Sequence, residues 1–190
     1  MLTVGISLLG NLYEDLESVL KQYEKKHKNF IFIGPSPIDF DKQMLYNQCV
    51  WDELCKFNLQ SLLKKGKTKI GIIFNTDPHH KDGAHWISMF IDIKKKYIFF
   101  FDSVGDKPPK EIVKLIDRIA SQGNRLNIDF NVIINTKSHQ REDTECGIYS
   151  LYLIIELLES KKNPEYFLTH RIPDKEMEKL RKKYFNKSSV

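Results

Sequence analysis

Apolar and aromatic residues recur three or four positions apart in three stretches of the chain, which predicts amphipathic helices that each bury one face. The first stretch is NLYEDLESVLKQYEKKH at residues 11–27. The second is KEIVKLIDRIASQ at residues 110–122, which Gly123 closes. The third is PDKEMEKLRKKYF at residues 173–185, with basic residues near its end, where the helix dipole favours positive charge.

Five shorter runs are rich in β-branched and aromatic residues, which is typical of strands. The third and fourth runs meet at KKK, and apolar residues alternate with polar ones along the third, so we expect them to form a β-hairpin. The first run is followed by GPSP, whose glycine and prolines predict that the strand stops there. Strands enclosed by helices at both ends of the chain predict an α+β fold. The runs are FIFIG (30–34), KIGIIFN (69–75), HWISMFIDI (85–93), KYIFFFDS (96–103) and NIDFNVIIN (127–135).

Residues 41–63 contain neither glycine nor proline and favour a further helix, straight or bent. Cys49, Cys55 and Trp51 would then pack in the core as apolar side chains. The chain has three cysteines, an odd number without CxxC spacing. This usage predicts a protein of a reducing compartment, without disulfides and without a structural zinc site.

Length, composition and charge narrow the class of protein further. A length of 190 residues with 41% hydrophobic and 12% aromatic residues predicts a single globular domain covering residues 1–190. The chain has no run of 18 apolar residues, and its apolar opening MLTVGISLLG lacks a preceding basic segment, so we expect neither a membrane span nor a signal peptide. Lysines and arginines exceed acidic residues by 30 − 25 = 5, a mild and dispersed excess that makes nucleic-acid binding a minor hypothesis.

Three polar residues fall at the ends of predicted elements. His85 begins the strand HWISMF, Asp102 ends the strand YIFFFD, and Cys146 begins the apolar helix CGIYSLYLII. In an antiparallel hairpin the start of one strand lies beside the end of the next, so His85 and Asp102 should meet at one edge of the sheet. A helix N-terminus and a neighbouring imidazole both favour the thiolate, and a carboxylate fixes the tautomer of the imidazole. The three residues therefore fit a cysteine nucleophile, its base and the orienting acid.

Gln140 lies six residues before Cys146 in the preceding loop. Its amide could stabilise the negative oxygen formed during acyl transfer, together with the Cys146 backbone N–H. Each of these residues also has an ordinary structural interpretation. The cysteine could be a core residue, the histidine a packed strand end, and Asp102 part of a turn with Ser103 and Gly105.

At these same positions the sequence resembles the ubiquitin-like-protein protease superfamily, which includes the SUMO proteases and the adenovirus endopeptidase. The resemblance rests on GAHWISMFIDIKKKYIFFFDS and HQREDTECGIYSLYLI and covers roughly residues 70–185, the expected catalytic core. The variant FNTD…G.HW with HQR..TECG.YSL is similar to the polyprotein-processing protease type of African swine fever virus and other large DNA viruses. That type also shares a pattern near the end of the chain: Arg171, Ile172, Asp174, Met177 and Arg181.

The resemblance implies an adenain- or SUMO-protease-like cysteine protease fold with a central mixed sheet. It implies His85, Asp102, Gln140 and Cys146 as catalytic residues, no cofactor, and cleavage after a Gly-Gly pair. Trp86 would form a wall of a narrow substrate channel, and Gly147 would also line the substrate site.

The chain departs from the family pattern at several places. Glu145 replaces the common aspartate before the cysteine, and Asp102 follows the cellular pattern where the swine-fever type has asparagine. A second channel tryptophan has no clear equivalent, and the opposite wall could come from residues 37–40. Residues 1–28, expected to be an N-terminal helical segment, lie outside the dense part of the resemblance.

Three hypotheses for function remain open from the sequence. The first is a viral polyprotein protease acting in the virion and the host cytoplasm, with DNA or a peptide as a possible activator. The second is an isopeptidase for ubiquitin or a ubiquitin-like modifier, and the third is a non-catalytic module that binds a modifier or nucleic acid. A metal at DPHHKDGAH (77–85) is disfavoured, because adjacent histidines in an extended loop tend to point to opposite sides.

Overall fold

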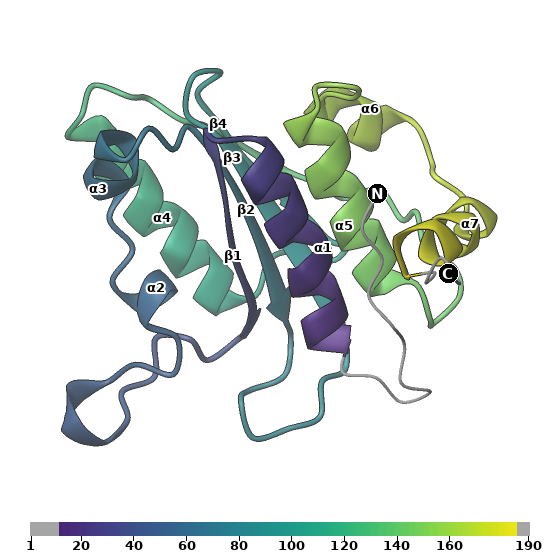
Figure 1. Cartoon of the computed structure of the whole chain (residues 1–190), viewed down its shortest axis with the longest axis horizontal. Coiled ribbons are helices and arrows are strands. Elements are labelled where there is room, and N and C mark those ends of the chain that lie inside the picture. The colour runs from purple at the N-terminus through teal and green to yellow at the C-terminus, as the bar shows by residue number, and fades with distance from the viewer. Residues whose placement is uncertain (1–11, 186–190) are drawn as a thin grey trace.

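A mixed five-stranded β-sheet forms the centre of the protein (Figure 1), whose computed structural model describes residues 12–185. The strand order follows the chain, and the three middle strands pair antiparallel. Each outer strand pairs parallel to its neighbour. The strands are β1 (Phe30–Pro37), β2 (Lys69–Asn75), β3 (Trp86–Asp92), β4 (Tyr97–Phe101) and β5 (Asn131–Ile134).

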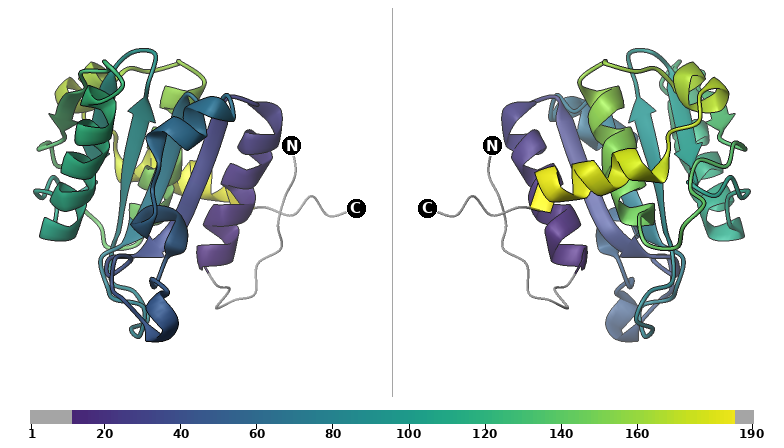
Figure 2. Two further views of the ribbon diagram at one scale, coloured as in Figure 1. Left: turned by 90° about the vertical axis from the view of Figure 1, so that its left-hand side faces the viewer. Right: turned by 90° about the vertical axis from the view of Figure 1, so that its right-hand side faces the viewer.

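Helices cover both faces of the sheet (Figure 1). One face carries α1 and α5, and the other carries α2, α3 and α4, while α7 runs across the side of α5 (Figure 2). The helices are α1 (Leu12–Lys26), the 3₁₀ turn η1 (Leu45–Asn47), α2 (Asp52–Cys55), α3 (Leu59–Lys64), α4 (Lys110–Asn124), α5 (Cys146–Leu158), α6 (Pro164–Thr169) and α7 (Asp174–Phe185). The α+β class and the mixed sheet are confirmed, as are the three expected amphipathic helices (α1, α4 and α7) and the helix that begins at Cys146 (α5).

Two hydrophobic cores follow from the alternation of side chains along the strands. In β3, Trp86 and Phe90 point toward α5, whereas Ile87, Met89 and Ile91 point toward α4. Every residue of α5 except Glu156 is buried, because the sheet, α1 and α7 surround this helix. The long apolar segment after the cysteine is therefore a central core helix.

The expected single helix over residues 41–63 is wrong. Tyr46 and Asn47 have φ angles of 60° and 58°, left-handed values that an α-helix cannot contain, and the segment forms a turn that exposes Leu45. Two short helices follow instead of one. The Asn58 side chain accepts a hydrogen bond from the backbone N–H of Ser61 at 2.8 Å and so begins α3 as a separate element.

The same segment corrects the expectation about cysteines. Cys49 and Cys55 form a disulfide. The expectation that the chain forms no disulfide is wrong, because Cys49 lies outside the helix α2 that ends at Cys55, so the two cysteines are not held on separate turns of one helix. Trp51 is half-buried and packs against the core on the α4 side.

β1 is longer than the sequence predicts. It continues through Gly34 and Pro35 to Pro37, with an irregularity in its pairing between Ile33 and Ser36. β1 lies at the edge of the sheet and pairs only with β2, so the missing N–H groups of its prolines do not break a central ladder.

Among residues 12–185 no helix combines the length and apolar character needed to cross a membrane. The expected absence of a signal peptide concerns residues 1–10, which lie outside the described residues.

Candidate active site

The hairpin of β3 and β4 brings His85 and Asp102 to the same edge of the sheet. His85 directly precedes β3 and Asp102 directly follows β4. The Nε2 atom of His85 lies 2.8 Å from Oδ1 of Asp102, a hydrogen bond between the ring and the carboxylate. The geometry expected from antiparallel pairing is therefore present.

The backbone holds Asp102 in place. Its Oδ1 also accepts the N–H of Val104 at 2.9 Å, and the buried Asn135 donates from Nδ2 to the Asp102 carbonyl at 2.8 Å. The carboxylate is thus oriented by its own turn and by the chain segment that follows β5. Its side chain is only 6% exposed, so water scarcely competes for the imidazole.

Cys146 is the first residue of α5, and its thiol is near enough to the His85 ring to influence the pKa of that ring. Nε2 of His85 is occupied by Asp102, which leaves Nδ1 as the ring nitrogen available to the thiol. Burial of the ring lowers the pKa of His85, but the interactions with Asp102 and Cys146 outweigh burial and raise this pKa to about 10. The site therefore favours a protonated ring, and a helix N-terminus is a position that favours a thiolate.

Gln140 lies in the loop of residues 135–145 that leads to the nucleophile, hereafter the cysteine loop. Its side-chain oxygen accepts the hydroxyl of the buried Ser103 at 2.6 Å, and its backbone N–H donates to the Ser103 carbonyl at 2.9 Å. Its Nε2 donates one hydrogen to the carbonyl of Glu142. An amide NH₂ carries two hydrogens, so one remains for a substrate oxygen.

A buried ion pair fixes the end of the cysteine loop. Nε of Arg181 in α7 lies 3.0 Å from both carboxylate oxygens of Glu145, and its guanidinium also donates to the Thr144 carbonyl at 2.6 Å. The Glu145 side chain is 5% exposed. The residue before the nucleophile is thus attached to a helix 36 positions later in the chain.

Asp174, at the start of α7, makes a second attachment to the same loop. Its carboxylate accepts the backbone N–H of Arg141 at 3.2 Å and the hydroxyl of the buried Tyr149 at 3.1 Å. Arg171 pairs with the same carboxylate at 3.1 Å. Both ends of the Gln140–Glu145 segment are therefore fixed by α7 and the residues just before it.

Trp86 lies close to Gly147, the residue after the nucleophile, and is 6% exposed, so its role as a channel wall stays a prediction. The ring of Tyr13 in α1 packs edge-on against it, with ring centroids 4.6 Å apart. Burial and the neighbouring Asp77 raise the pKa of Tyr13, which keeps its phenol neutral. Gly147 is buried against Leu12 and Trp86, on the inner side of the nucleophile, and its substrate-binding role stays a prediction.

The loop of residues 76–84 that leads to His85, hereafter the histidine loop, is held differently. Oδ1 of Asn75 accepts the Asp77 N–H at 2.8 Å, and Gly83 with a φ of 97° packs against the Asn75 amide. Farther out, Asp39 accepts the His79 N–H at 2.9 Å and lies 2.7 Å from His79 Nδ1. Most of this loop is exposed.

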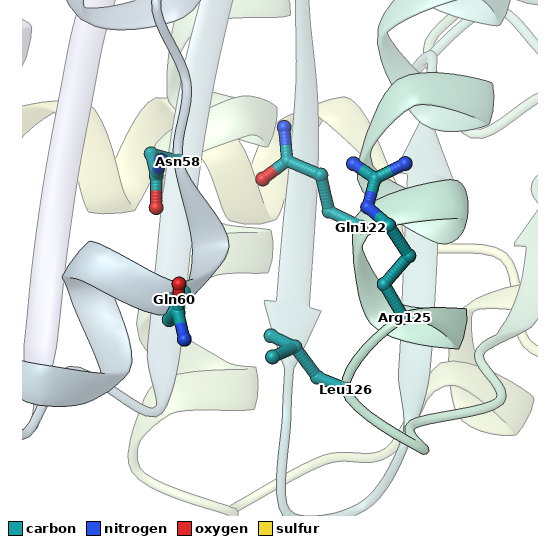
Figure 3. A pocket seen from close by; sticks show the side chains of 5 residues that line it. All are labelled: Asn58, Gln60, Gln122, Arg125 and Leu126. Carbon is teal, nitrogen blue, oxygen red and sulfur yellow. The ribbon is translucent and has the colours of Figure 1, made fainter.

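A pocket of about 370 Å³ lies between α3 and α4, on the side of the sheet away from α5 (Figure 3). Its polar groups already serve the fold: Gln122 bonds to the backbone of Leu59 and Phe57, and Asn58 caps α3. None of the residues predicted to be catalytic lines it, so it is not the reaction site.

Several residues that shape the site were not predicted from the sequence. Ser103 and Asn135 follow strands as ordinary polar turn residues, and Tyr13 lies in the apolar stripe of a helix far from Trp86 in sequence. Arg171, Asp174 and Arg181 did give a signal, as parts of the pattern near the end of the chain.

A buried thiol at a helix N-terminus, near an imidazole that is hydrogen-bonded to a carboxylate, is the arrangement that a cysteine nucleophile requires. The chain belongs to the Ulp1 protease family and matches its C-terminal catalytic domain over residues 10–189. Membership of this family identifies the chain as a cysteine protease.

Relatives with similar sequences are viral proteins. A protein of Acanthamoeba polyphaga mimivirus named as a thiol protease is 31% identical over 175 residues, which are 90% of this chain and 55% of that protein. A SUMO-1 cysteine protease of African swine fever virus is 28% identical over 180 residues, covering 90% of this chain and 66% of that protein. The chain thus spans between about half and two thirds of the length of these relatives.

Solved structures show the same fold. The crystal structure of a protease of African swine fever virus matches with a TM-score of 0.77 at 23% identity, covering 96% of this chain and 71% of that one. The C-terminal Ulp1 protease domain in complex with Smt3, the yeast ortholog of SUMO, matches with a TM-score of 0.53 at 19% identity. The match covers 77% of this chain and 64% of that one.

Proposed function

We propose that this chain is an active thiol endopeptidase that cleaves after Gly-Gly pairs in viral polyproteins. The observation that carries the proposal is the hydrogen bond of 2.8 Å between His85 and Asp102, with the Cys146 thiol at the start of α5 near the same ring. Under this proposal the enzyme works in the cytoplasm of infected cells and in the virion.

The arrangement supports each step of acyl transfer. The Cys146 thiolate attacks the carbonyl carbon of the second glycine, and the resulting oxyanion accepts hydrogen bonds from Gln140 Nε2 and the Cys146 N–H. The His85 imidazolium donates its proton to the leaving amine as the C–N bond breaks. The neutral ring then takes a proton from water, whose oxygen attacks the thioester and releases the acid product.

Gly-Gly specificity is supported by the crowding around the nucleophile. Trp86 and Tyr13 form an aromatic pair beside α5. Under this proposal the substrate strand passes the pair to reach Cys146, and large side chains there would clash with the rings. Glycine has no side chain and can approach a backbone or a ring most closely.

The test compares cleavage of Gly-Gly-X peptides by the wild type and by Cys146→Ala. We expect product after the second glycine with the wild type alone, detected by mass spectrometry. Peptides with Ala-Ala in place of Gly-Gly serve as the specificity control. Equal cleavage by both proteins would end the proposal of a thiol mechanism, and equal cleavage of both peptides would end the Gly-Gly specificity.

A second candidate function is removal of a ubiquitin-like modifier, since the matched Ulp1 domain is bound to Smt3. Modifier and polyprotein substrates would present the same Gly-Gly ending to Cys146. Labelling with a panel of modifiers that carry a C-terminal electrophile separates the two. Rapid labelling by one modifier, with slow cleavage of all polyprotein peptides, would favour the isopeptidase.

A further inference from the structure

Three side chains with metal-ligating atoms gather at the outer end of the histidine loop. Asp39 follows β1, whereas His79 and His80 lie between β2 and β3. One ligand atom from each residue lies within 4.8 Å of the other two. The two histidine rings are edge-on with centroids 5.3 Å apart, so the expectation that these adjacent histidines point to opposite sides is wrong.

Hydrogen bonds hold Asp39 and His79 of this cluster in place. Asp39 accepts the His79 backbone N–H at 2.9 Å with one oxygen and lies 2.7 Å from His79 Nδ1 with the other. The Ile38 N–H also donates to the Asp77 carbonyl at 3.1 Å, which holds the two segments side by side. The contact of Asp39 with His79 holds the carboxylate and the imidazole side by side, where a metal ion can replace the proton between them.

The donor set selects a class of cation. Two imidazoles and one carboxylate suit zinc and its neighbours among the transition metals, with water in the remaining positions. Magnesium and calcium prefer oxygen ligands alone. We propose that Asp39, His79 and His80 bind a divalent cation of the zinc class at the surface of the histidine loop. A bound ion would tie this loop to the end of β1, five residues before His85.

The test uses Zn²⁺ as the probe and full-length protein without a histidine tag, kept non-reducing so that Cys49 and Cys55 stay bonded. All proteins carry Cys146→Ala, which removes the active-site thiol as a competing ligand. His80→Ala and Asp39→Asn alter the proposed site. Asp82→Asn is the matched control, because it removes one exposed carboxylate from the same loop outside the cluster. Isothermal titration calorimetry measures affinity, and thermal unfolding with and without Zn²⁺ gives an independent readout.

We expect one Zn²⁺ to bind the parent and the Asp82→Asn control equally. We expect binding about tenfold weaker or worse in His80→Ala and Asp39→Asn, which is within the range for loss of a ligand or its support. Zn²⁺ should raise the melting temperature of the parent and of Asp82→Asn but not of the two site variants. Mg²⁺ should raise the melting temperature of none of the four proteins. Equal Zn²⁺ affinity in all four proteins, or no Zn²⁺ binding to the parent, would overturn the proposal. Because His80 is exposed, its replacement leaves the fold intact and keeps the test valid even where Asp39→Asn unfolds.

Discussion

The two loops that converge on the active site are held by different kinds of contact. The cysteine loop is fixed by buried polar groups, which include Gln140 on Ser103 and Glu145 on Arg181. The histidine loop is fixed at its base by Asn75, and its outer part depends on the more exposed pair of Asp39 and His79. Buried polar contacts are costly to break, whereas exposed ones exchange with water at little cost. The nucleophile and the oxyanion donor are therefore on the more firmly held of the two loops, and the histidine loop is the more adaptable one.

The largest expected effect comes from Asp102→Ala, which removes the side chain that holds His85. We expect kcat/KM for a Gly-Gly peptide to fall by about 10³–10⁴-fold, because the imidazole loses the partner that fixes its tautomer and charge. Asp106→Ala is the control, since this residue is exposed and outside the site. A loss of less than tenfold would mean that Asp102 is a turn residue and does not orient His85.

The pH profile tests the same contact with a definite sign. The folded-state pKa of His85 is raised from 6.5 to about 10, so the imidazolium is stabilised. The stability it contributes is fully present below pH 6.5 and is lost as the pH rises through about 10. In the wild type the alkaline limb of kcat/KM should therefore lie near pH 10, and in Asp102→Ala it should move to lower pH. A wild-type limb near neutral pH would contradict the ion-pair interpretation.

Gln140→Ala, in the cysteine loop, should have the next largest effect on activity. Loss of one oxyanion donor typically lowers kcat by about 10²–10³-fold, with little change in KM. Ser103→Ala is the sharper companion, since it leaves the amide in place but removes the hydroxyl that orients it, and we expect only a few-fold loss. If both variants lose activity equally, orientation rather than donation is the main contribution of Gln140.

Arg181→Ala tests the attachment of the cysteine loop to α7. Leaving one partner of a buried pair unpaired costs about 3–5 kcal/mol, and since Arg181 is itself 38% exposed we expect about 2 kcal/mol. Chemical denaturation measures the loss, with Lys183→Ala as an exposed control on the same helix. Adding Glu145→Gln to Arg181→Ala should restore part of the stability, because no buried charge remains.

Asp39→Asn, measured with a chelator present, should have the smallest effect. The contact with His79 is partly exposed, and such contacts contribute about 0.2–1 kcal/mol, so activity should change by no more than a few-fold. Peptide turnover and denaturation, with Asp82→Asn as control, check this. A loss as large as that of Arg181→Ala would show that the two loops are equally rigid and would end the comparison.

The sequence predicted the strands and the larger helices because their apolar spacing is strong and local. It also predicted that His85 and Asp102 meet, since hairpin pairing alone determines that contact. It did not predict the turn at Tyr46, where a left-handed backbone replaces a helix without any Gly or Pro as a signal. Asp39 approaches His79 across 40 positions and Tyr13 approaches Trp86 across 73 positions, so these contacts depend on how separate elements pack.

The link between Glu145 and Arg181 has a consequence for biosynthesis. As the chain emerges from the ribosome, the β3–β4 hairpin and Cys146 are made before α7. At that stage Glu145, the residue before the nucleophile, lacks its partner Arg181. Peptide hydrolysis should therefore begin only after α7 has been synthesised and has packed against the cysteine loop. A chain stopped at Pro173 that turned over peptide at the full rate would show that no such delay exists.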